Sequence, residues 1–478
     1  MKTSDGEEHE PSTTTNQTAR QPDLSRSSGT AILSKLHASL RFCEVGPVEK
    51  PFRGDLQHFT PFPPFSTELR VAMLAKLATL DEAMDRAIGS MVGLAVGDSV
   101  GAPLEFIGAV DSGTGASRVD IATLTYQNAC NRFDLRAGQW TDDTAMSLCL
   151  ADSLLVSNGK LDGTDLRERF WSWWFQGYNN AFRKQCRERV GSVGLGGNIS
   201  KSLYSMKVGL RPTPEYEAQG SDAGNGSIMR LAPIAVAHCA ATTAAQLSDA
   251  RAIAAASSRS THPGTIAAEA CAFLAHLLIM AITRFEPGPP GAARAFLFAT
   301  ADEYIENVLM PRAPKAAGSG RGKGEGEGED NGEGVVVMLR LLASNEPSGS
   351  LERMWNWRKD SLDIAGTMLA RGPTYNGYPN TAEYLGSYAP DALAIALHAI
   401  ANTDSFDSAV ERCVNTLGDA DSHGAVCGQI AGAMYGWRAI GPHLRAALNE
   451  WDDAEIGLRA ALLVHTARAR EAENSSAV

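Results

Sequence analysis

Apolar residues recur at the spacing of an α-helix along most of the chain between residues 68 and 470. In such a pattern the apolar side chains return every three or four residues and share one face of a helix. Alternation with the period of a strand is scarce, and only the run VVVML at residues 335–339 suggests a strand. No repeated alternation of strand and helix patterns is present, which disfavours a doubly wound sheet. The sequence predicts one compact all-α domain, with helices in segments 84–96, 144–155, 253–257, 267–282, 392–400, 406–417 and 425–435.

Two segments have a composition typical of chains that do not pack. Residues 1–66 are rich in Ser, Thr, Pro and charged residues, so we expect a disordered tail, although residues 31–42 also allow a short amphipathic helix. Residues 318–334 are almost entirely Gly, Glu and other polar residues, which predicts a flexible loop. Apolar helical segments flank this loop and would lack cores alone. We therefore place it, from about 313 to 334, inside a single domain at 67–472, followed by a short tail at 473–478.

The overall charge restricts the kind of partner. The chain of 478 residues carries a net charge of −12, which argues against a protein that coats duplex nucleic acid. We expect small ligands, metals and proteins as partners, and no direct nucleic-acid binding. The most apolar run, residues 265–283, contains Glu269 and His276 and falls short of the roughly 18 uninterrupted apolar residues of a membrane span. We interpret it as a buried helix and expect no membrane partner.

The cysteines indicate the compartment. None of the eight forms a CxxC pair and most stand in apolar stretches, which is typical of reduced, buried thiols and not of a disulfide framework or a zinc site. The N-terminal residues also lack the apolar core of a signal peptide. These features predict an intracellular protein, in the cytoplasm or alternatively in the nucleus.

Two aspartates stand where one predicted helix begins, in the sequence GQWTDDTAMSLCLADSLL from Gly138. Thr141, Asp142, Asp143 and Thr144 fall in its first turn. Acids and hydroxyls there commonly cap free amides and complement the helix dipole. Two adjacent aspartates beside a tryptophan exceed what a cap needs, and consecutive oxygens at a turn can also bind a hard cation. Both interpretations stay open on local grounds.

A second acidic motif, GDADSHGAVCGQIAGAMYG, begins at Gly418. Asp419 and Asp421 lie two residues apart and Ser422 follows, so an extended backbone would direct two carboxylates and a hydroxyl toward one site. A turn or a helix cap is the alternative. Behind the acids, glycines recur every four residues on one helix face, which favours close approach of another backbone. These glycines are Gly424, Gly428, Gly432 and Gly436.

Three further segments are weaker signals. GLAVGDSVGAPLEF ends an apolar helix and leads to Glu105, as an ordinary helix end and loop would. GNGS, at residues 224–227, precedes an apolar helix, where free amides can bind an anion such as pyrophosphate, although a simple turn has the same pattern. His262 stands in the sequence STHP, and a lone histidine before proline is more often structural.

Together the five segments resemble the ADP-ribosylglycohydrolase family, which includes the dinitrogenase reductase-activating glycohydrolases and the ADP-ribosyl-acceptor hydrolases. The resemblance covers residues 83–436 and is carried, in order, by GLAVGDSVGAPLEF, WTDDT, GNGSIMRLAP, STHP and DADS with its glycine series. WTDDT and DADS-x5-GxIxGAxxG are the most specific of these. The resemblance implies a compact all-α hydrolase of glycosyl bonds (EC 3.2) that removes ADP-ribose from protein side chains or degrades ADP-ribose polymers.

The resemblance also implies the site residues. It implies two magnesium ions, with manganese as an alternative, between one set of oxygen ligands in WTDDT and another in DADS. Glu105 falls where some members carry a mobile acidic residue at the metal site. The glycine segment matches a loop that binds the phosphates of ADP-ribose, and His262 matches a residue near the ligand. The implied metal ligands are Thr141, Asp142, Asp143, Asp419, Asp421 and Ser422, and the implied substrate-binding residues are Ser221, Gly224, Asn225, Gly226, Ser227 and His262.

The chain departs from the family pattern at two positions of the second acidic motif. Ser422 stands where the family usually has threonine, and the serine keeps the oxygen ligand. His423 is unusual there, and we interpret it as a neighbour of the metals because imidazole suits Mg²⁺ poorly. The N-terminal tail and the Gly/Glu insertion also lie outside the pattern.

The implied reaction is hydrolysis of the glycosidic bond at the distal ribose, with ADP-ribosylated proteins or ADP-ribose derivatives as partners. A carboxylate must take a proton from the attacking water, and Glu105, Asp142 and Asp143 are the candidates. The linkage stays open between arginine, serine and the polymer.

Two other functions are disfavoured. A non-catalytic ADP-ribose-binding or structural relative on the same fold is the main alternative, but all the matched acids are present. A haloacid-type phosphatase needs an apolar strand before its Asp-x-Asp, where this chain has a helical pattern. The cluster of Trp171, Trp173 and Trp174 is a candidate platform for adenine, although we favour a place in the core.

Overall fold

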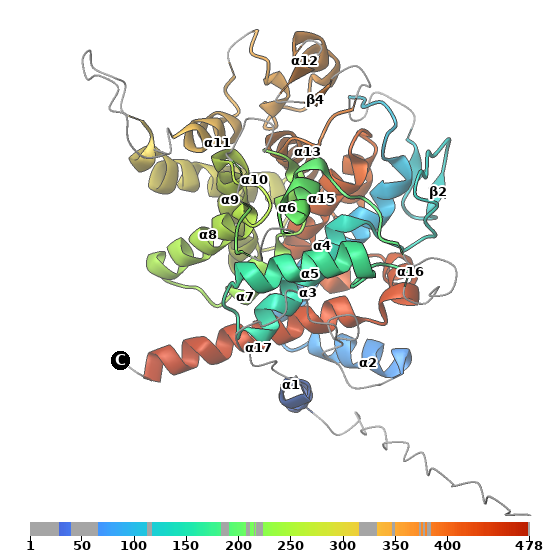
Figure 1. Cartoon of the computed structure of the whole chain (residues 1–478), viewed down its shortest axis with the longest axis vertical. Helices are drawn as coiled ribbons and strands as arrows, with labels where there is room; N and C mark the ends of the chain where they lie inside the picture. Colours follow the sequence, from blue (N-terminus) through green and yellow to red (C-terminus); the bar gives the residue numbers. More distant parts are fainter. Residues whose placement is uncertain are drawn as a thin grey trace, which may run out of the picture.

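The computed structural model describes residues 28–39, 66–111, 117–182, 191–206, 211–214, 216, 223–314, 332–346, 349–371, 374–375, 378–379 and 384–476. Within these ranges the chain forms seventeen α-helices and only two short β-hairpins (Figure 1). Strand β1 (Val119–Asp120) pairs antiparallel with β2 (Thr125–Tyr126), and β3 (Thr374–Tyr375) with β4 (Tyr378–Pro379). The prediction of an all-α fold is confirmed.

The helices range from six to 22 residues in length. Side chains cap several of them: Asp81 accepts a hydrogen bond from the Met84 N–H at 2.8 Å before α3, and Thr243 and Gln246 form a capping box before α8. In chain order the α-helices are α1 (Gly29–Ser39), α2 (Thr67–Leu77), α3 (Glu82–Gly101), α4 (Asp142–Val156), α5 (Gly163–Gln176), α6 (Gly197–Ser205), α7 (Ala232–Ala237), α8 (Ala244–Arg259), α9 (Thr265–Arg284), α10 (Ala292–Tyr304), α11 (Glu333–Ala343), α12 (Ile364–Arg371), α13 (Ala389–Ala401), α14 (Phe406–Val414), α15 (Ala420–Tyr435), α16 (Pro442–Asp452) and α17 (Glu455–Ser476). The short 3₁₀ or π-helical segments are η2 (Ala102–Leu104), η5 (Asn225–Ser227), η6 (Ile305–Leu309), η7 (Met310–Arg312), η8 (Arg353–Trp355) and η10 (Trp437–Ala439).

Helices α3 and α15 pack antiparallel, and their backbones touch along glycines. A Cβ added at Gly97 would lie 2.0 Å from the Gly424 carbonyl oxygen, and one added at Gly93 would lie 2.3 Å from that of Gly428. The predicted close approach of another backbone to the glycine face of α15 is confirmed. The partner face has the same spacing of four, which the sequence analysis did not identify. Its residues are Gly89, Gly93, Gly97 and Gly101.

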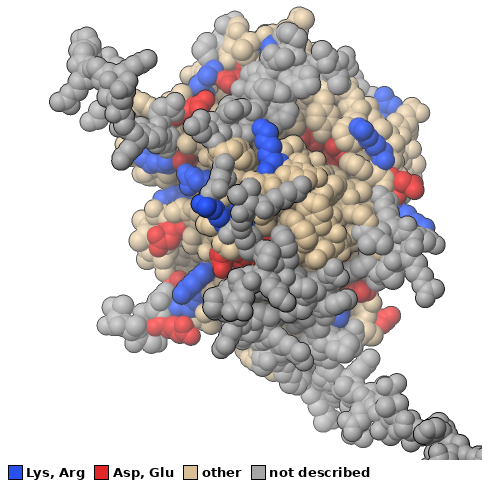
Figure 2. Space-filling model, viewed as in Figure 1, with Lys and Arg blue, Asp and Glu red and all other residues tan. Residues whose placement is uncertain are grey.

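Two helices of the described part are long and apolar enough to cross a membrane, as judged by length and composition alone. They are α9 and the stretch Glu82–Leu104, which joins α3 and η2. Of their most apolar windows, 94% and 100% respectively are buried inside the protein, which is what core helices show. On the face seen in Figure 2, basic and acidic side chains are interspersed among uncharged surface.

One segment of the predicted tail is folded, contrary to our expectation. Residues Gly29–Ser39 form helix α1, which lies against α17 and α2 and appears below α17 in Figure 1. Its apolar residues Ile32, Leu33 and Leu36 are between 1% and 4% exposed. The helix is stabilised by tertiary packing, which local composition does not reveal. The rest of the predicted tail, residues 1–27 and 40–65, and residues 315–331 of the predicted loop lie outside the described residues.

The suggested strand at residues 335–339 is wrong, because this run belongs to helix α11. Three β-branched residues in succession favour a strand locally. The helical face is set by the burial of Met338, Leu341 and Leu342, which are 0% exposed and share the helical spacing. Packing on the core therefore decides the conformation of this segment.

The substitution Gly97→Ala tests the close packing of α3 on α15. The added Cβ would meet a backbone oxygen that cannot move without shifting α15, so we expect the free energy of unfolding to fall by about 1–3 kcal/mol. Gly197→Ala is the matched control, since a Cβ at this helical glycine meets no heavy atom within 4 Å. Denaturant unfolding measures both variants. Wild-type stability in Gly97→Ala would contradict the packing described here.

Candidate active site

Both predicted acidic motifs lie at helix N-termini that meet inside the protein. Thr141 is the N-cap of α4, and Asp142 and Asp143 occupy its first turn. Asp419 is the N-cap of α15, and Asp421 occupies its first turn. A helix N-terminus carries partial positive charge and unpaired N–H groups, so acids are favourable there. The two motifs, far apart in the sequence, form one site.

An acid of α3 that we did not predict joins them. Asp98 accepts hydrogen bonds from the backbone N–H of Thr141 at 3.0 Å and of Thr144 at 3.0 Å. It also accepts from the Thr141 hydroxyl at 2.9 Å and from the Thr144 hydroxyl at 2.6 Å. Asp98 thus fixes the start of α4 against α3, beside the start of α15. A single acid inside a buried apolar helix was the available sequence signal, because such a group needs partners.

The Thr141 hydroxyl lies at the meeting point of three carboxylates. Its oxygen is 2.9 Å from Asp98, 3.0 Å from Asp143 and 3.3 Å from Asp421. A hydroxyl has one proton to donate, so it satisfies one of the three. In the described part of the chain, carboxylate oxygens lie within 4.8 Å of one another in two groups, Asp98–Asp143–Asp421 and Glu105–Asp419–Asp421. Asp421 belongs to both groups.

Burial and mutual repulsion disfavour the charged form of these acids. Burial raises the pKa of Asp98 to about 6. Burial, and then the neighbouring carboxylates, hold the pKa values of Asp142, Asp143 and Asp421 well above the ordinary value of an aspartate. Asp143 also has a buried oxygen, Oδ1, without a hydrogen-bond partner among the described residues. Crowded oxygens with an unmet demand for positive charge are the donor set of a hard divalent cation, so the residues fit the implied metal.

Glu105 is positioned by backbone hydrogen bonds between the segment that follows it and the segment that precedes Asp419. Phe106 donates its N–H to the carbonyl of Gly418 at 3.1 Å, and Gly418 donates to the carbonyl of Ile107 at 2.8 Å. These bonds hold Glu105 beside Asp419. The Tyr384 hydroxyl donates to Glu105 Oε1 at 3.1 Å. Burial, and then the charge of Asp419, raise the pKa of Glu105 to about 8.

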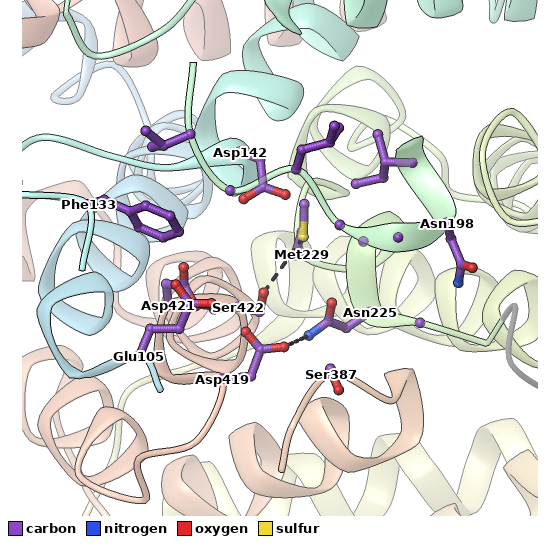
Figure 3. A pocket seen from close by; sticks show the side chains of 18 of the residues that line it. Glu105, Phe133, Asp142, Asn198, Asn225, Met229, Ser387, Asp419, Asp421 and Ser422 are labelled. Carbon is purple, nitrogen blue, oxygen red and sulfur yellow. Dashed lines mark hydrogen bonds between the residues drawn. The ribbon is translucent and has the colours of Figure 1, made fainter. Parts of the chain in front are cut away.

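A pocket of about 700 Å³ opens onto the acids, within the range of small-molecule sites. In Figure 3, Glu105, Asp419, Asp421 and Ser422 lie together on one side, and Asn198 lies on the far side. Two glycine-rich segments, residues 194–197 and 224–226, form much of the wall between them. Glycine lets a ligand approach the backbone closely, so this wall suits an anionic group.

Asn225 connects the glycine wall to the acids. Its side-chain amide donates to Asp419 Oδ2 at 2.9 Å, which is drawn as a dashed line in Figure 3. The same amide donates to the Gly386 carbonyl at 2.9 Å. Its backbone N–H donates to the Ser387 carbonyl at 2.9 Å. Ser422, in turn, lies at the pocket wall with its hydroxyl 3.8 Å from the sulfur of Met229.

The structure brings most of the predicted substrate-binding residues to the pocket, but not Ser227. Gly224, Asn225, Gly226 and His262 line it. Ser227 is 1% exposed and accepts a hydrogen bond from the Ser258 hydroxyl at 2.9 Å, so it faces the core. The GNGS segment is a 3₁₀ turn and helix α7 begins only at Ala232, so the predicted helix N-terminus at this segment is wrong. Ser221 lies outside the described residues.

His262 is held as a neutral ring. It is 1% exposed, and its Nδ1 lies 2.8 Å from the Thr261 hydroxyl oxygen. Burial, and then the charge of Arg230, lower the pKa of His262 to about 3. The buried Arg230 guanidinium donates to the Gly226 carbonyl and to the Thr261 hydroxyl, both at 2.8 Å. Arg230 thereby ties the glycine turn to the STHP segment.

The remaining sequence candidates take different places. His423 is 0% exposed, and neither ring nitrogen has a hydrogen-bond partner among the described residues. Trp173 is buried, as predicted for the core, whereas Trp174 lines the pocket. Gly194, which we did not predict, has a φ of +88°, and a Cβ there would lie 2.0 Å from Asp142 Oδ1. The glycine is therefore what allows this segment to cover Asp142.

The structure is an all-α fold in which buried carboxylates at the N-termini of two helices open to a pocket and could hold metal ions. The sequence model of the family described as ADP-ribosylglycohydrolase matches residues 79–473. The chain therefore belongs to the ADP-ribosylglycohydrolase family, whose members are hydrolases acting on glycosyl bonds.

Individual relatives agree with this assignment. The chain is similar to the ADP-ribosylarginine hydrolase Tri1 of Pseudomonas putida (strain GB-1), with 28% identity over 366 residues that cover 76% of this chain and 74% of that protein. It is similar to the ADP-ribosyl-[dinitrogen reductase] glycohydrolase of Rhodospirillum rubrum, with 27% identity over 352 residues that cover 74% and 86%. Among solved structures, an "ADP-ribosylglycohydrolase-related protein complex" matches 80% of this chain and 99% of its own, with 28% identity and a TM-score of 0.50.

The raised pKa values predict how the stability of the metal-free protein depends on pH. The folded state binds more protons than the unfolded state between the ordinary pKa of an acid, about 4, and the pKa of about 8 at Glu105. The free energy of unfolding should therefore fall as the pH rises through this window. Excess Mg²⁺ should raise the free energy of unfolding again, by about 2.7 kcal/mol when the free Mg²⁺ concentration is 100 times the dissociation constant. Thermal unfolding with and without Mg²⁺, from pH 5 to 8, measures both effects.

The variant Asp143→Asn separates the contribution of the buried carboxylate groups to the pH dependence of stability from that of the other titrating groups. It removes one of the repelling charges, so its metal-free stability should depend less on pH and respond little to Mg²⁺. An equal response to Mg²⁺ in this variant and the wild type would show that Asp143 is not part of a cation site.

Proposed function

We propose that this chain is a Mg²⁺-dependent ADP-ribosylarginine hydrolase that removes ADP-ribose from arginine side chains of proteins. The observation that carries the proposal is the pair of overlapping carboxylate groups at the base of a pocket with a glycine-rich wall. The arginine linkage rests on the similarity to proteins named ADP-ribosylarginine hydrolase. Since the cysteines in the described residues are all free, we propose the reducing cytoplasm as its location.

The proposed ligands of two magnesium ions are the oxygens of the two helix N-termini. One set comes from Thr141, Asp142 and Asp143, and the other from Asp419, Asp421 and Ser422. Mn²⁺ has similar preferences and is an alternative. When bound, the cations would supply Lewis-acid chemistry that neutralises the carboxylates and orients the ribose hydroxyls and the water.

The glycine wall supports the binding of a pyrophosphate. Helix α6 begins at Gly197, and its N-cap, Gly196, has no capping side chain, so N–H groups are available where the helix faces the pocket. Together with Gly224 and Gly226, which line the pocket on either side of the hydrogen-bonded Asn225, these groups can hold the phosphates of ADP-ribose. Binding there is remote from the reacting bond and positions the distal ribose over the acids.

Glu105 is the proposed general base. The oxygen of water forms a bond to the anomeric carbon of the distal ribose, while the bond from this carbon to the arginine nitrogen breaks. The water proton passes to Glu105, and the guanidine leaves with the electron pair of the broken bond and receives a proton. Glu105 suits this role because it lines the pocket, Tyr384 holds one of its oxygens, and the other has no hydrogen-bond partner among the described residues. Asp142 also lines the pocket and is the second candidate, whereas Asp143 is 0% exposed beneath it.

A panel of substrates tests the function. Peptides with ADP-ribose on arginine or on serine, and poly(ADP-ribose), are each incubated with the enzyme in Mg²⁺ or in EDTA. We expect release of ADP-ribose from the arginine peptide in Mg²⁺ only, and no release by Asp421→Asn. Faster cleavage of the serine peptide or the polymer would overturn the proposed linkage, and unchanged activity in EDTA would overturn the metal requirement.

The substitution Glu105→Gln tests the base. Glutamine preserves the shape and removes the proton acceptor, so turnover should fall by roughly 10² to 10⁴, the range for a general base. ADP-ribose affinity, measured by calorimetry with Mg²⁺, should change much less because the glycine wall remains. Tyr384→Phe is the comparison variant, since it keeps the Glu105 carboxylate and removes the hydroxyl that hydrogen-bonds to Glu105 and to Asp419, so it should lower turnover modestly. Normal turnover in Glu105→Gln would leave Asp142 as the base.

A further inference from the structure

An aromatic cluster with one cation lies at the mouth of the pocket, on the side of the acids. The ring of Phe106 stacks on Tyr384 with centroids 5.6 Å apart and an angle of 12° between the planes. It meets Phe133 edge to face at 5.8 Å and 72°. The guanidinium of Arg132 lies over the Phe106 ring, 4.7 Å from its centroid. All four residues line the pocket, and we name them the aromatic wall.

The backbone of Phe106 is held in an uncommon conformation. Its φ is +69°, in the left-handed region that bulky residues rarely adopt. The hydrogen bond from its N–H to the Gly418 carbonyl helps to hold it there. The ring is 37% exposed, so burial in the core does not account for the conformation. Strained residues of this kind concentrate where a ligand is bound.

The acids lie between the aromatic wall and the glycine wall formed by residues 194–197 and 224–226. Phe106 directly follows Glu105, and Tyr384 donates its hydroxyl to Glu105. In Figure 3, Phe133 lies beside the acids, and Asn198, which follows the glycine segment 194–197, lies across the pocket from it. If the phosphates occupy the glycine wall and the distal ribose lies over the acids, the group attached to the ribose extends toward Phe106.

We propose that the aromatic wall is the leaving-group subsite and that the Phe106 ring selects a planar guanidinium by stacking. This proposal rests on the proposed function for the direction in which the substrate lies. A guanidinium is planar and weakly hydrated and stacks on aromatic faces, whereas an ammonium or a hydroxyl gains less from such a face. The guanidinium of Arg132 already occupies this face, which shows that the ring accommodates the group. Arg132 is therefore an internal competitor of the substrate arginine.

Binding of small cations in the presence of saturating ADP-ribose and Mg²⁺ tests the subsite. Agmatine carries a guanidinium at one end of a four-carbon chain and an ammonium at the other, and 1,5-diaminopentane carries two ammonium groups with similar total charge and reach. By calorimetry we expect agmatine to bind at least tenfold more tightly than 1,5-diaminopentane. Phe106→Leu should reduce agmatine affinity at least tenfold, Phe106→Tyr should retain it, and Arg132→Gln should increase it severalfold.

Phe175→Leu is the matched control, because this ring is 45% exposed on α5 and does not line the pocket. It should leave agmatine affinity unchanged. Equal binding of agmatine and 1,5-diaminopentane, or wild-type agmatine affinity in Phe106→Leu, would overturn the proposal. If Phe106→Leu does not fold, a failure of Arg132→Gln to tighten agmatine binding overturns it. A failure of the proposed function itself is distinct, since ADP-ribose would then not bind in Mg²⁺ or the arginine peptide would not be cleaved.

Discussion

The contact between the glycine faces of α3 and α15 is the constraint on which the site depends. At each level of this contact, a backbone oxygen of one helix occupies the space where a side chain of the other would begin. Because the helices are antiparallel, the C-terminal end of α3 meets the N-terminal end of α15. Asp98 and Glu105 come from the first of these ends, and Asp419 and Asp421 come from the second. A side chain between the helices would separate these acids, so the distances within the carboxylate groups depend on the absence of Cβ atoms along this contact.

The acids are brought together at a cost in stability that other interactions offset. Burial disfavours each carboxylate, and each neighbouring carboxylate adds repulsion, as the raised pKa values show. These effects are opposed by the helix N-termini of α4 and α15, by the two N–H groups and two hydroxyls of Thr141 and Thr144 that donate to Asp98, and by the amide of Asn225. These interactions do not satisfy every oxygen, as Asp143 Oδ1 shows. The fold thus maintains an arrangement that a bound cation completes.

The sequence predicted the acids of the site better than the interactions that position them. WTDDT and DADS were recognisable because several oxygens stand close together in the chain, and the structure brings both motifs together. Asp98 was missed because its role depends on donors 43 and 46 residues away. Ser227 was assigned to the ligand by the family resemblance, and a turn sequence does not specify which way each side chain points. Helix α1 was only an alternative to a disordered tail, and helix α11 was mispredicted as a strand, because in both cases the deciding contact is with a surface that the rest of the chain supplies.

The charges along the pocket imply an order of binding. A pyrophosphate is anionic, so when ADP-ribose enters alone it repels every ionised acid beneath it and raises the pKa values of these acids further. Two unit charges about 10 Å apart repel by about 1.7 kcal/mol at an effective dielectric constant of about 20, and several such pairs exceed what a few amide hydrogen bonds contribute. Divalent cations on the acids reverse the sign of this interaction. If the chain is the Mg²⁺-dependent hydrolase proposed above, cations therefore strengthen binding of the substrate as well as supporting its hydrolysis.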